Sequence, residues 1–249
     1  MISNEELAGR VIDAIGREKP FSVARFGDGE LYVVQGANKP VLSPPLQIPY
    51  QKHVGYIPGP ELRAQLGQAI RLAASSADCL GVSLNVGEKW RAARNFFSAL
   101  AGTGAELCSA DFHTDWLRTG LLREVATKAK EIVLVTGHKI LRERFEAQFG
   151  VPTGIIPIPL QVKYFGRRKK RRVRHYPDAY MKVLAEIGSR SQKGRVFFVG
   201  AGFPGKPYMT AVKAQGGVVV DLGSAFDLLA GFKTRGTKGQ RKDWEEFKL

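Results

Sequence analysis

Two carboxylates alternate with two glycines in Gly27-Asp28-Gly29-Glu30, directly after an apolar segment. If the chain is extended here, the side chains of Asp28 and Glu30 project to the same side. Such a pair of carboxylates suits a hard divalent cation, Mg²⁺ or Mn²⁺, and the ion would neutralise a diphosphate leaving group. Gly27 and Gly29 would let a ligand approach the backbone closely. Taken alone, the triplet is also explained as a glycine turn with two solvated acids.

A second glycine-rich stretch, Gly200-Ala-Gly202-Phe-Pro-Gly205-Lys206, follows an apolar run near the other end of the chain. With Asp221 about 20 residues later, it has the dinucleotide-binding pattern, in which the acid binds ribose hydroxyls. Too little sequence follows it for the usual six-stranded order. Lys206 beside the last glycine suits a cation at a phosphate. Three interpretations stay open: a phosphate- or substrate-facing loop containing Gly200, Gly202 and Lys206, a structural turn, or an NAD site.

Three side chains after another predicted strand are candidate general bases: Asp111, His113 and Asp115. Transfer to a hydroxyl needs a base within hydrogen-bond reach of that hydroxyl, and an imidazole has a suitable intrinsic pKa. A histidine alone in a loop is more often structural. Asp221 and Ser224 are candidates for contact with donor or acceptor hydroxyls, although Ser224 is equally well explained as a helix N-cap.

The elements that must position these residues alternate along the chain. Ser3 and Glu6 predict a capping box at the start of the first helix. Residues 36–60 are rich in proline and glycine and predict a long loop. Beyond residue 60, predicted helices and strands alternate, with one helix expected over 115–129. This rhythm predicts an α/β fold with a largely parallel sheet and helices on both faces. In such sheets ligands bind outside the carboxyl ends of the strands, where the glycines and acids above are expected to meet.

Composition limits the remaining choices. A chain of 249 residues suits one large domain, with a charged, loosely packed tail expected from about residue 233. Cys79 and Cys108 lie in apolar runs and predict two buried thiols. The N-terminus lacks the features of a signal peptide, and no apolar run approaches the length of a membrane span. We therefore expect a cytoplasmic protein.

The net charge of +15 predicts a surface that attracts anions. The densest cluster is the basic run Arg167–Arg174. It is explained as a solvated segment, as a site for an anionic acceptor or the inner membrane surface, or as a nucleic-acid contact. Nucleic acid is the weakest of these because no helix-turn-helix, zinc-finger or RNA-recognition signature accompanies the run. A nucleic-acid- or polyanion-binding α/β protein is thus the alternative from another functional class.

The segment from Phe21 to Leu31, which contains Arg25-Phe-Gly-Asp-Gly-Glu30, resembles the signature of the GT-D-type glycosyltransferases. A second resemblance lies in Gly216–Asp227, which is similar to the C-terminal Gly-Gly…Asp-x-Gly-Ser…Asp segment of that family. Residues 40–190 match the family only in the alternation of predicted helices and strands. The basic run Arg167–Arg174 is not expected of the family.

The resemblance implies one Rossmann-like GT-D domain over residues 1–249 and a metal-dependent glycosyltransferase of the hexosyltransferase type. It implies a nucleotide-sugar donor, with a UDP-sugar favoured, and a glycan or glycoprotein acceptor. Asp28 and Glu30 would bind Mn²⁺ or Mg²⁺ and the donor diphosphate. Arg25 would contact phosphate or a neighbouring acid.

Overall fold

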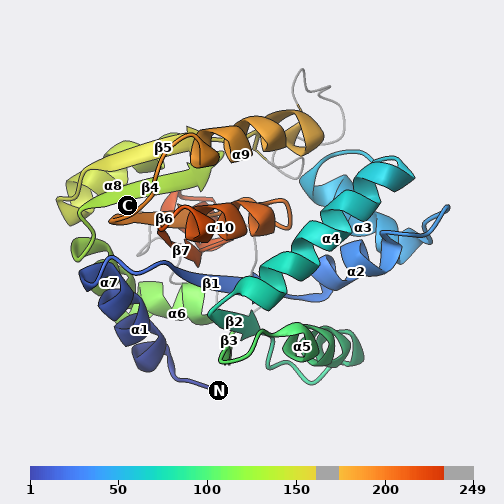
Figure 1. The fold of residues 1–249 in the computed structure, drawn as a ribbon, viewed down its shortest axis with the longest axis horizontal. Helices are drawn as coiled ribbons and strands as arrows, with labels where there is room; N and C mark the ends of the chain where they lie inside the picture. Colours follow the sequence, from blue (N-terminus) through green and yellow to red (C-terminus); the bar gives the residue numbers. More distant parts are fainter. Residues whose placement is uncertain (161–173, 233–249) are drawn as a thin grey trace.

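The computed structural model of the chain describes residues 1–160 and 174–232 (Figure 1). Most of the basic run and the charged tail from 233 lie outside these residues. The described chain forms a seven-stranded sheet in the order β3-β2-β1-β7-β6-β4-β5, with all neighbours parallel. This confirms the predicted fold class. The strands are β1 (Phe21–Phe26), β2 (Cys79–Val82), β3 (Glu106–Ser109), β4 (Glu131–Thr136), β5 (Thr153–Pro157), β6 (Arg195–Val199) and β7 (Val218–Asp221).

Helices cover both faces of the sheet, and each face has its own apolar core. One face carries α2 (Asp28–Gly36), α3 (Pro44–His53), α4 (Pro60–Ser76), α5 (Glu88–Leu100), the turn η2 (His175–Ala179), α9 (Tyr180–Gly188) and α10 (Gly205–Ala214). The other carries α1 (Asn4–Gly16), α6 (Phe112–Thr119), α7 (Leu121–Thr127), α8 (Leu141–Phe149) and α11 (Ala225–Leu229).

Alternate residues of the central strands enter opposite cores. In β1, Val23 packs with the α1 side, whereas Ala24 and Phe26 pack with the α2 side. Because successive side chains of a strand point to opposite faces, a strand buried on both sides reads as an apolar run. This is why the central strands are visible in the sequence.

The chain leaves β1 and its neighbour β7 toward opposite faces. The strand β1 leads into α2, and β7 leads into α11. Adjacent parallel strands whose following segments diverge leave a crevice at their carboxyl ends, where α/β proteins bind ligands. The Gly27–Glu30 segment and Asp221 therefore meet at one place although they are far apart in sequence.

Two predicted elements differ from the structure. The expected loop over residues 36–60 contains α3, which begins at Pro44. Proline is well tolerated in the first turn of a helix because the N–H it lacks has no partner there, so Pro44 and Pro45, which suggested a loop, instead start a helix, and Pro49 lies inside it. The helix expected over 115–129 is two helices, α6 and α7, separated by Gly120 in a left-handed conformation (φ 81°).

Three further predictions concern capping, cysteines and membranes. The Ser3–Glu6 capping box is present at the start of α1. Cys79 and Cys108 are buried free thiols, and burial raises the pKa of Cys108 to about 12. Within residues 1–160 and 174–232, no helix has the length and apolar character needed to cross a membrane.

Candidate active site

A polar pocket lies at the carboxyl ends of the central strands. It encloses about 1050 Å³ when the solvent at its open mouth is included. Apart from His113 and Asp115, the predicted site residues line it: Arg25, Gly27, Asp28, Gly29, Glu30, Asp111, Gly200, Gly202, Lys206, Asp221 and Ser224. The fold thus brings both glycine-rich stretches to one opening.

The Asp28–Glu30 segment is helical, which corrects the extended geometry expected from the sequence. These residues form the first turn of α2, where positions i and i+2 are about 200° apart around the axis. The physical reason is a cap, since the Glu30 carboxylate accepts a hydrogen bond of 3.1 Å from the backbone N–H of Gly27. Both acids still line the pocket because the N-terminus of the helix faces it.

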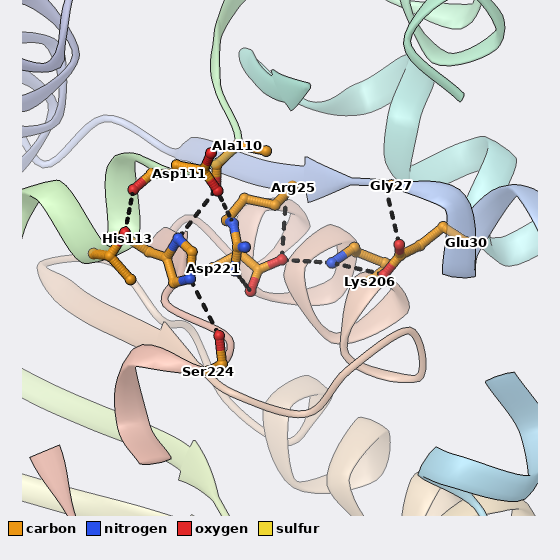
Figure 2. Close-up of polar contacts among 10 residues, drawn as sticks. Arg25, Gly27, Glu30, Ala110, Asp111, His113, Lys206, Asp221 and Ser224 are labelled. Atoms are coloured by element: carbon orange, nitrogen blue, oxygen red, sulfur yellow. Dashed lines mark hydrogen bonds and ion pairs between the residues drawn. The ribbon is translucent and has the colours of Figure 1, made fainter. Parts of the chain in front are cut away.

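Lys206 is a buried cation at the centre of the site (Figure 2). Its ammonium group donates a hydrogen bond to Asp221 Oδ2 and lies 3.5 Å from Glu30 Oε1. Its side chain is 4% exposed, and those of Asp221 and Glu30 are 7% and 16% exposed. Because a buried charge is costly without partners, the two carboxylates are what allow the ammonium group to be buried here.

Arg25 reaches the same cluster from β1. Its backbone N–H donates to Asp221 Oδ2 over 3.3 Å, and its Nε donates to the carbonyl of Ala110 over 2.5 Å. Its guanidinium group lies 4.0 Å from Asp221 Oδ1. Of the two contacts expected for Arg25, phosphate or a neighbouring acid, the structure shows the acid. Arg25, Asp221, Lys206 and Glu30 therefore form one chain of alternating charges (Figure 2), which we call the charge chain.

Two glycines make room for this arrangement. A Cβ atom on Gly223, whose φ is 47°, would lie 2.3 Å from a guanidinium nitrogen of Arg25. A Cβ atom on Gly200 would lie 2.2 Å from the ring of Phe226 in α11. Part of the Gly200–Gly205 pattern thus has a packing role, which is independent of any ligand.

Ser224 and His113 form a second polar contact at the pocket. His113 is buried in the first turn of α6 rather than placed in a loop, and its ring points toward Ser224 (Figure 2). Its Nδ1 is 3.1 Å from the Ala110 carbonyl, and its Nε2 is 3.2 Å from Ser224 Oγ. A carbonyl only accepts, so Nδ1 carries a proton. Ser224 occupies the N-cap position of α11, but its side chain makes no cap hydrogen bond.

The two acids on the remaining sides of the pocket differ in exposure. Asp111 lies at the N-cap of α6 and is exposed. Its backbone N–H donates to Ser109 Oγ over 3.1 Å. Asp227, in the first turn of α11, is buried. In the sequence, Asp227 was only the last member of the C-terminal resemblance.

Several pocket residues were not selected from the sequence. Trp90 and Phe203 add aromatic surface, and Ser83 and Asn85 add polar groups at the end of β2. Asn85 Nδ2 donates to Ser83 Oγ over 3.1 Å. A search of the first helical turn after each strand, not only of the loop, would have found Trp90, since it lies in the first turn of α5.

The pocket suits a divalent ion that takes most of its ligands from substrate and water. Among the described residues, no group of three or more His, Cys, Asp or Glu side chains could hold a metal ion. Asp28 and Glu30 are the two carboxylates expected to hold it, and Asp28 lies 3.4 Å from the exposed Lys89. One or two carboxylates plus substrate phosphates are a usual set for Mg²⁺, so the donor set fits such an ion.

Comparison with known proteins agrees with this architecture. The GT-D-like family, described as a GT-D fold-like domain, matches residues 2–229. The chain belongs to the GT-D-like family. The family match confirms the resemblance drawn from the two terminal motifs, although it assigns no role to their residues.

Two solved structures share the fold of this GT-D-like chain. One is described as the highly conserved domain of unknown function 1792 with a distinct glycosyltransferase fold, at a TM-score of 0.52. The other is a selenomethionine-substituted structure of domain of unknown function 1792, at 0.55. Each is 14% identical, and the alignments cover 100% of this chain and 89% of the other. No curated protein sequence matches the chain.

Proposed function

We propose that this GT-D-like protein is a glycosyltransferase that moves a sugar from a nucleotide-sugar donor to an acceptor hydroxyl. The observation that carries the proposal is the arrangement of the pocket. Asp28 and Glu30 line the same pocket as the buried cation Lys206, which lies beside Glu30, at the crevice between β1 and β7. The glycosyltransferase fold of the two solved structures supports the same class of activity.

The donor diphosphate is placed at the α2 and α10 side of the pocket. Both helices begin there, so their N-terminal N–H groups and dipoles favour an anion. Lys206 adds a positive charge that is already fixed in position by Asp221. Preorganised charges of this kind stabilise the negative charge that develops on a leaving group.

Asp28 and Glu30 would hold a divalent cation, Mn²⁺ or Mg²⁺, together with the diphosphate. When bound, the ion supplies Lewis-acid neutralisation of the leaving nucleoside diphosphate. Without it, the two carboxylates would repel a diphosphate, which is why we propose that the reaction depends on metal. A UDP-sugar is the first donor to test, and the proposed acceptor is a glycan or glycoprotein.

The NAD interpretation of the second glycine stretch is less well supported by the site. The acid that would bind the ribose hydroxyls, Asp221, is buried between Lys206 and Arg25. Gly200 is explained by its close approach to Phe226. The polyanion-binding alternative depends mainly on the basic run, of which only Arg174 lies among the described residues.

The test is release of a nucleoside diphosphate from a panel of UDP-, GDP- and dTDP-sugars, with Mn²⁺ and with EDTA. We expect one donor base to support slow hydrolysis in the absence of acceptor, and we expect EDTA to abolish it. Binding of NAD without metal, or no release from any donor together with salt-sensitive binding of polyanions, would contradict the proposal and favour the corresponding alternative.

A further inference from the structure

The turn that leads into α11 presents two polar side chains to the pocket, and a buried histidine contacts each of them. Ser224 is contacted by His113, and Asp227 is contacted by His138. Both histidines are buried, at 4% and 7% exposure, and they come from different segments, α6 and the loop after β4. This end of the pocket adjoins the charge chain, whose cations are Lys206 and Arg25, because the Ala110 carbonyl accepts from both Arg25 Nε and His113 Nδ1.

Contacts of both the backbone and the ring hold His138 in place. Its backbone N–H donates to Thr136 Oγ1 over 3.2 Å. Its ring lies 5.0 Å from the ring of Phe232, centroid to centroid. Its Nε2 is 3.0 Å from Asp227 Oδ1. An ionised Asp227 carboxylate, the form that a general base requires, would accept this hydrogen bond from Nε2.

Asp227 is fixed from its own side as well. It lies in the first turn of α11, and its carbonyl accepts a hydrogen bond of 2.7 Å from the N–H of Phe232. The residue that packs on the His138 ring is therefore also tied to the backbone of Asp227. Carboxylate, imidazole and aromatic ring are thus in mutual contact beside the pocket.

We propose, resting on the proposed glycosyltransferase function, that Asp227 is the general base that activates the acceptor hydroxyl and that His138 is its positioning residue. A base must be held within hydrogen-bond reach of the hydroxyl that it deprotonates. Of the two pocket acids outside the expected metal site and the charge chain, Asp111 is exposed, whereas Asp227 is buried and oriented by an imidazole. A carboxylate that is shielded from water and fixed in direction is the better placed of the two.

The step balances as a single displacement. The acceptor oxygen forms a bond to the anomeric carbon while its O–H bond breaks, and the proton passes to the Asp227 carboxylate. The bond from the anomeric carbon to the diphosphate oxygen breaks, and the nucleoside diphosphate leaves with the electron pair. Attack opposite the leaving group inverts the anomeric centre, so this assignment also predicts an inverting enzyme.

The experiment measures kcat and KM for transfer in Asp227→Asn, using the donor that the wild type hydrolyses with Mn²⁺. We expect kcat to fall by about 100-fold or more, with donor KM unchanged and with thermal stabilisation by the nucleoside diphosphate retained. The exposed acid in α8 gives a matched control, Glu146→Gln, which we expect to behave as the wild type.

The positioning role of His138 is tested by two substitutions. We expect His138→Ala to lower kcat by about 10- to 100-fold, since misplacing a catalytic group has effects of that order. We expect His138→Gln, whose amide still donates to the carboxylate, to recover most of the loss without a matching change in thermal stability. Equal activity of the two variants would assign His138 a purely structural role and overturn this part of the proposal.

Three outcomes overturn the assignment of Asp227. One is an Asp227→Asn enzyme that keeps its kcat, the second is an Asp111→Asn enzyme that alone loses it, and the third is retention of the anomeric configuration by NMR of the product. If the wild type releases no nucleoside diphosphate from any donor, the proposed function itself fails. If release is normal and only these results are contrary, the failure is confined to Asp227 and His138.

Discussion

The two ends of the pocket handle charge in different ways. At the β1 end, the charge chain alternates cations and anions, so each buried charge is neutralised by a neighbour before any ligand binds. At the α11 end, Ser224 and Asp227 are each contacted by a buried histidine. The first arrangement suits the binding of a charged donor, and the second suits proton transfer.

Because of this difference, substitutions at the β1 end should act mainly on stability, and substitutions at the α11 end mainly on catalysis. Removing one member of the charge chain leaves a buried charge without its partner, which is costly to the fold. Removing a hydroxyl or reorienting a carboxylate at the α11 end changes fewer charges. Substitutions that act on the two ends should therefore differ in their effects on the free energy of unfolding.

The largest effect is expected for Lys206→Met. It leaves Asp221 and Glu30 without their shared cation, and we expect the free energy of unfolding to fall by about 3 kcal/mol. The matched control is Lys213→Met, because Lys213 pairs with Asp78 over 2.8 Å but both side chains are more exposed, at 27% and 32%. We expect a loss there of about 0.5–1 kcal/mol. Equal losses in urea denaturation would show that the charge chain is not a special feature of the fold.

A smaller effect is expected for Gly200→Ala, which tests the packing that joins the two ends. The added methyl group would meet the ring of Phe226 at 2.2 Å, and such overpacking costs about 1–3 kcal/mol. Gly9→Ala in α1 is the control, since nothing lies within 4 Å of its Cβ position. We expect that change to stabilise the protein by about 0.5–1 kcal/mol. If Gly200→Ala left the free energy of unfolding unchanged, packing against Phe226 would not explain this glycine, and a direct contact with a ligand would be favoured.

The smallest effect is expected for Ser224→Ala at the α11 end. It removes the hydroxyl 3.2 Å from His113 Nε2, and we expect a loss of about 1 kcal/mol in the free energy of unfolding. Ser75→Ala, at an exposed serine that donates to a helix carbonyl, should cost less. If Ser224→Ala destabilised the protein as much as Lys206→Met, the proposed contrast between the two ends would be wrong.

The sequence predicted the fold well because its signals are local. Strands that are buried on both faces appear in the sequence as apolar runs, and the Ser3–Glu6 capping box marks the start of a helix within four residues. The ambiguous signals were proline and glycine. Pro44 starts a helix that was expected to be a loop, and Gly120 divides a helix that was expected to be continuous. In both cases the residue type permits more than one local structure, and tertiary packing selects among them.

The sequence predicted which residues form the candidate site better than it predicted their geometry. The sequence selected Asp28, Glu30 and Lys206, but it expected the two acids on an extended chain and did not pair them with the lysine. The contact between Glu30 and Lys206 joins segments 176 residues apart, and no local pattern encodes it. The His138–Asp227 pair was missed for the same reason, since it depends on the proximity of the β4 loop to α11.

The central claim is that the pocket binds a nucleoside diphosphate through a divalent ion at Asp28 and Glu30. The most direct test is thermal unfolding with UDP, GDP, dTDP or NAD, each with and without Mn²⁺, in the wild type, Glu30→Gln and the exposed control Glu61→Gln. Glutamine keeps an acceptor for the Gly27 N–H but removes the charge, so the helix cap should survive.

At 100 times the dissociation constant, a ligand stabilises the folded state by about 2.7 kcal/mol, which corresponds to several degrees for a domain of this size. We predict such a shift with one nucleoside diphosphate, only with Mn²⁺, in the wild type and Glu61→Gln but not in Glu30→Gln. A shift that is independent of Mn²⁺, an undiminished shift in Glu30→Gln, or a shift with NAD alone would contradict the account.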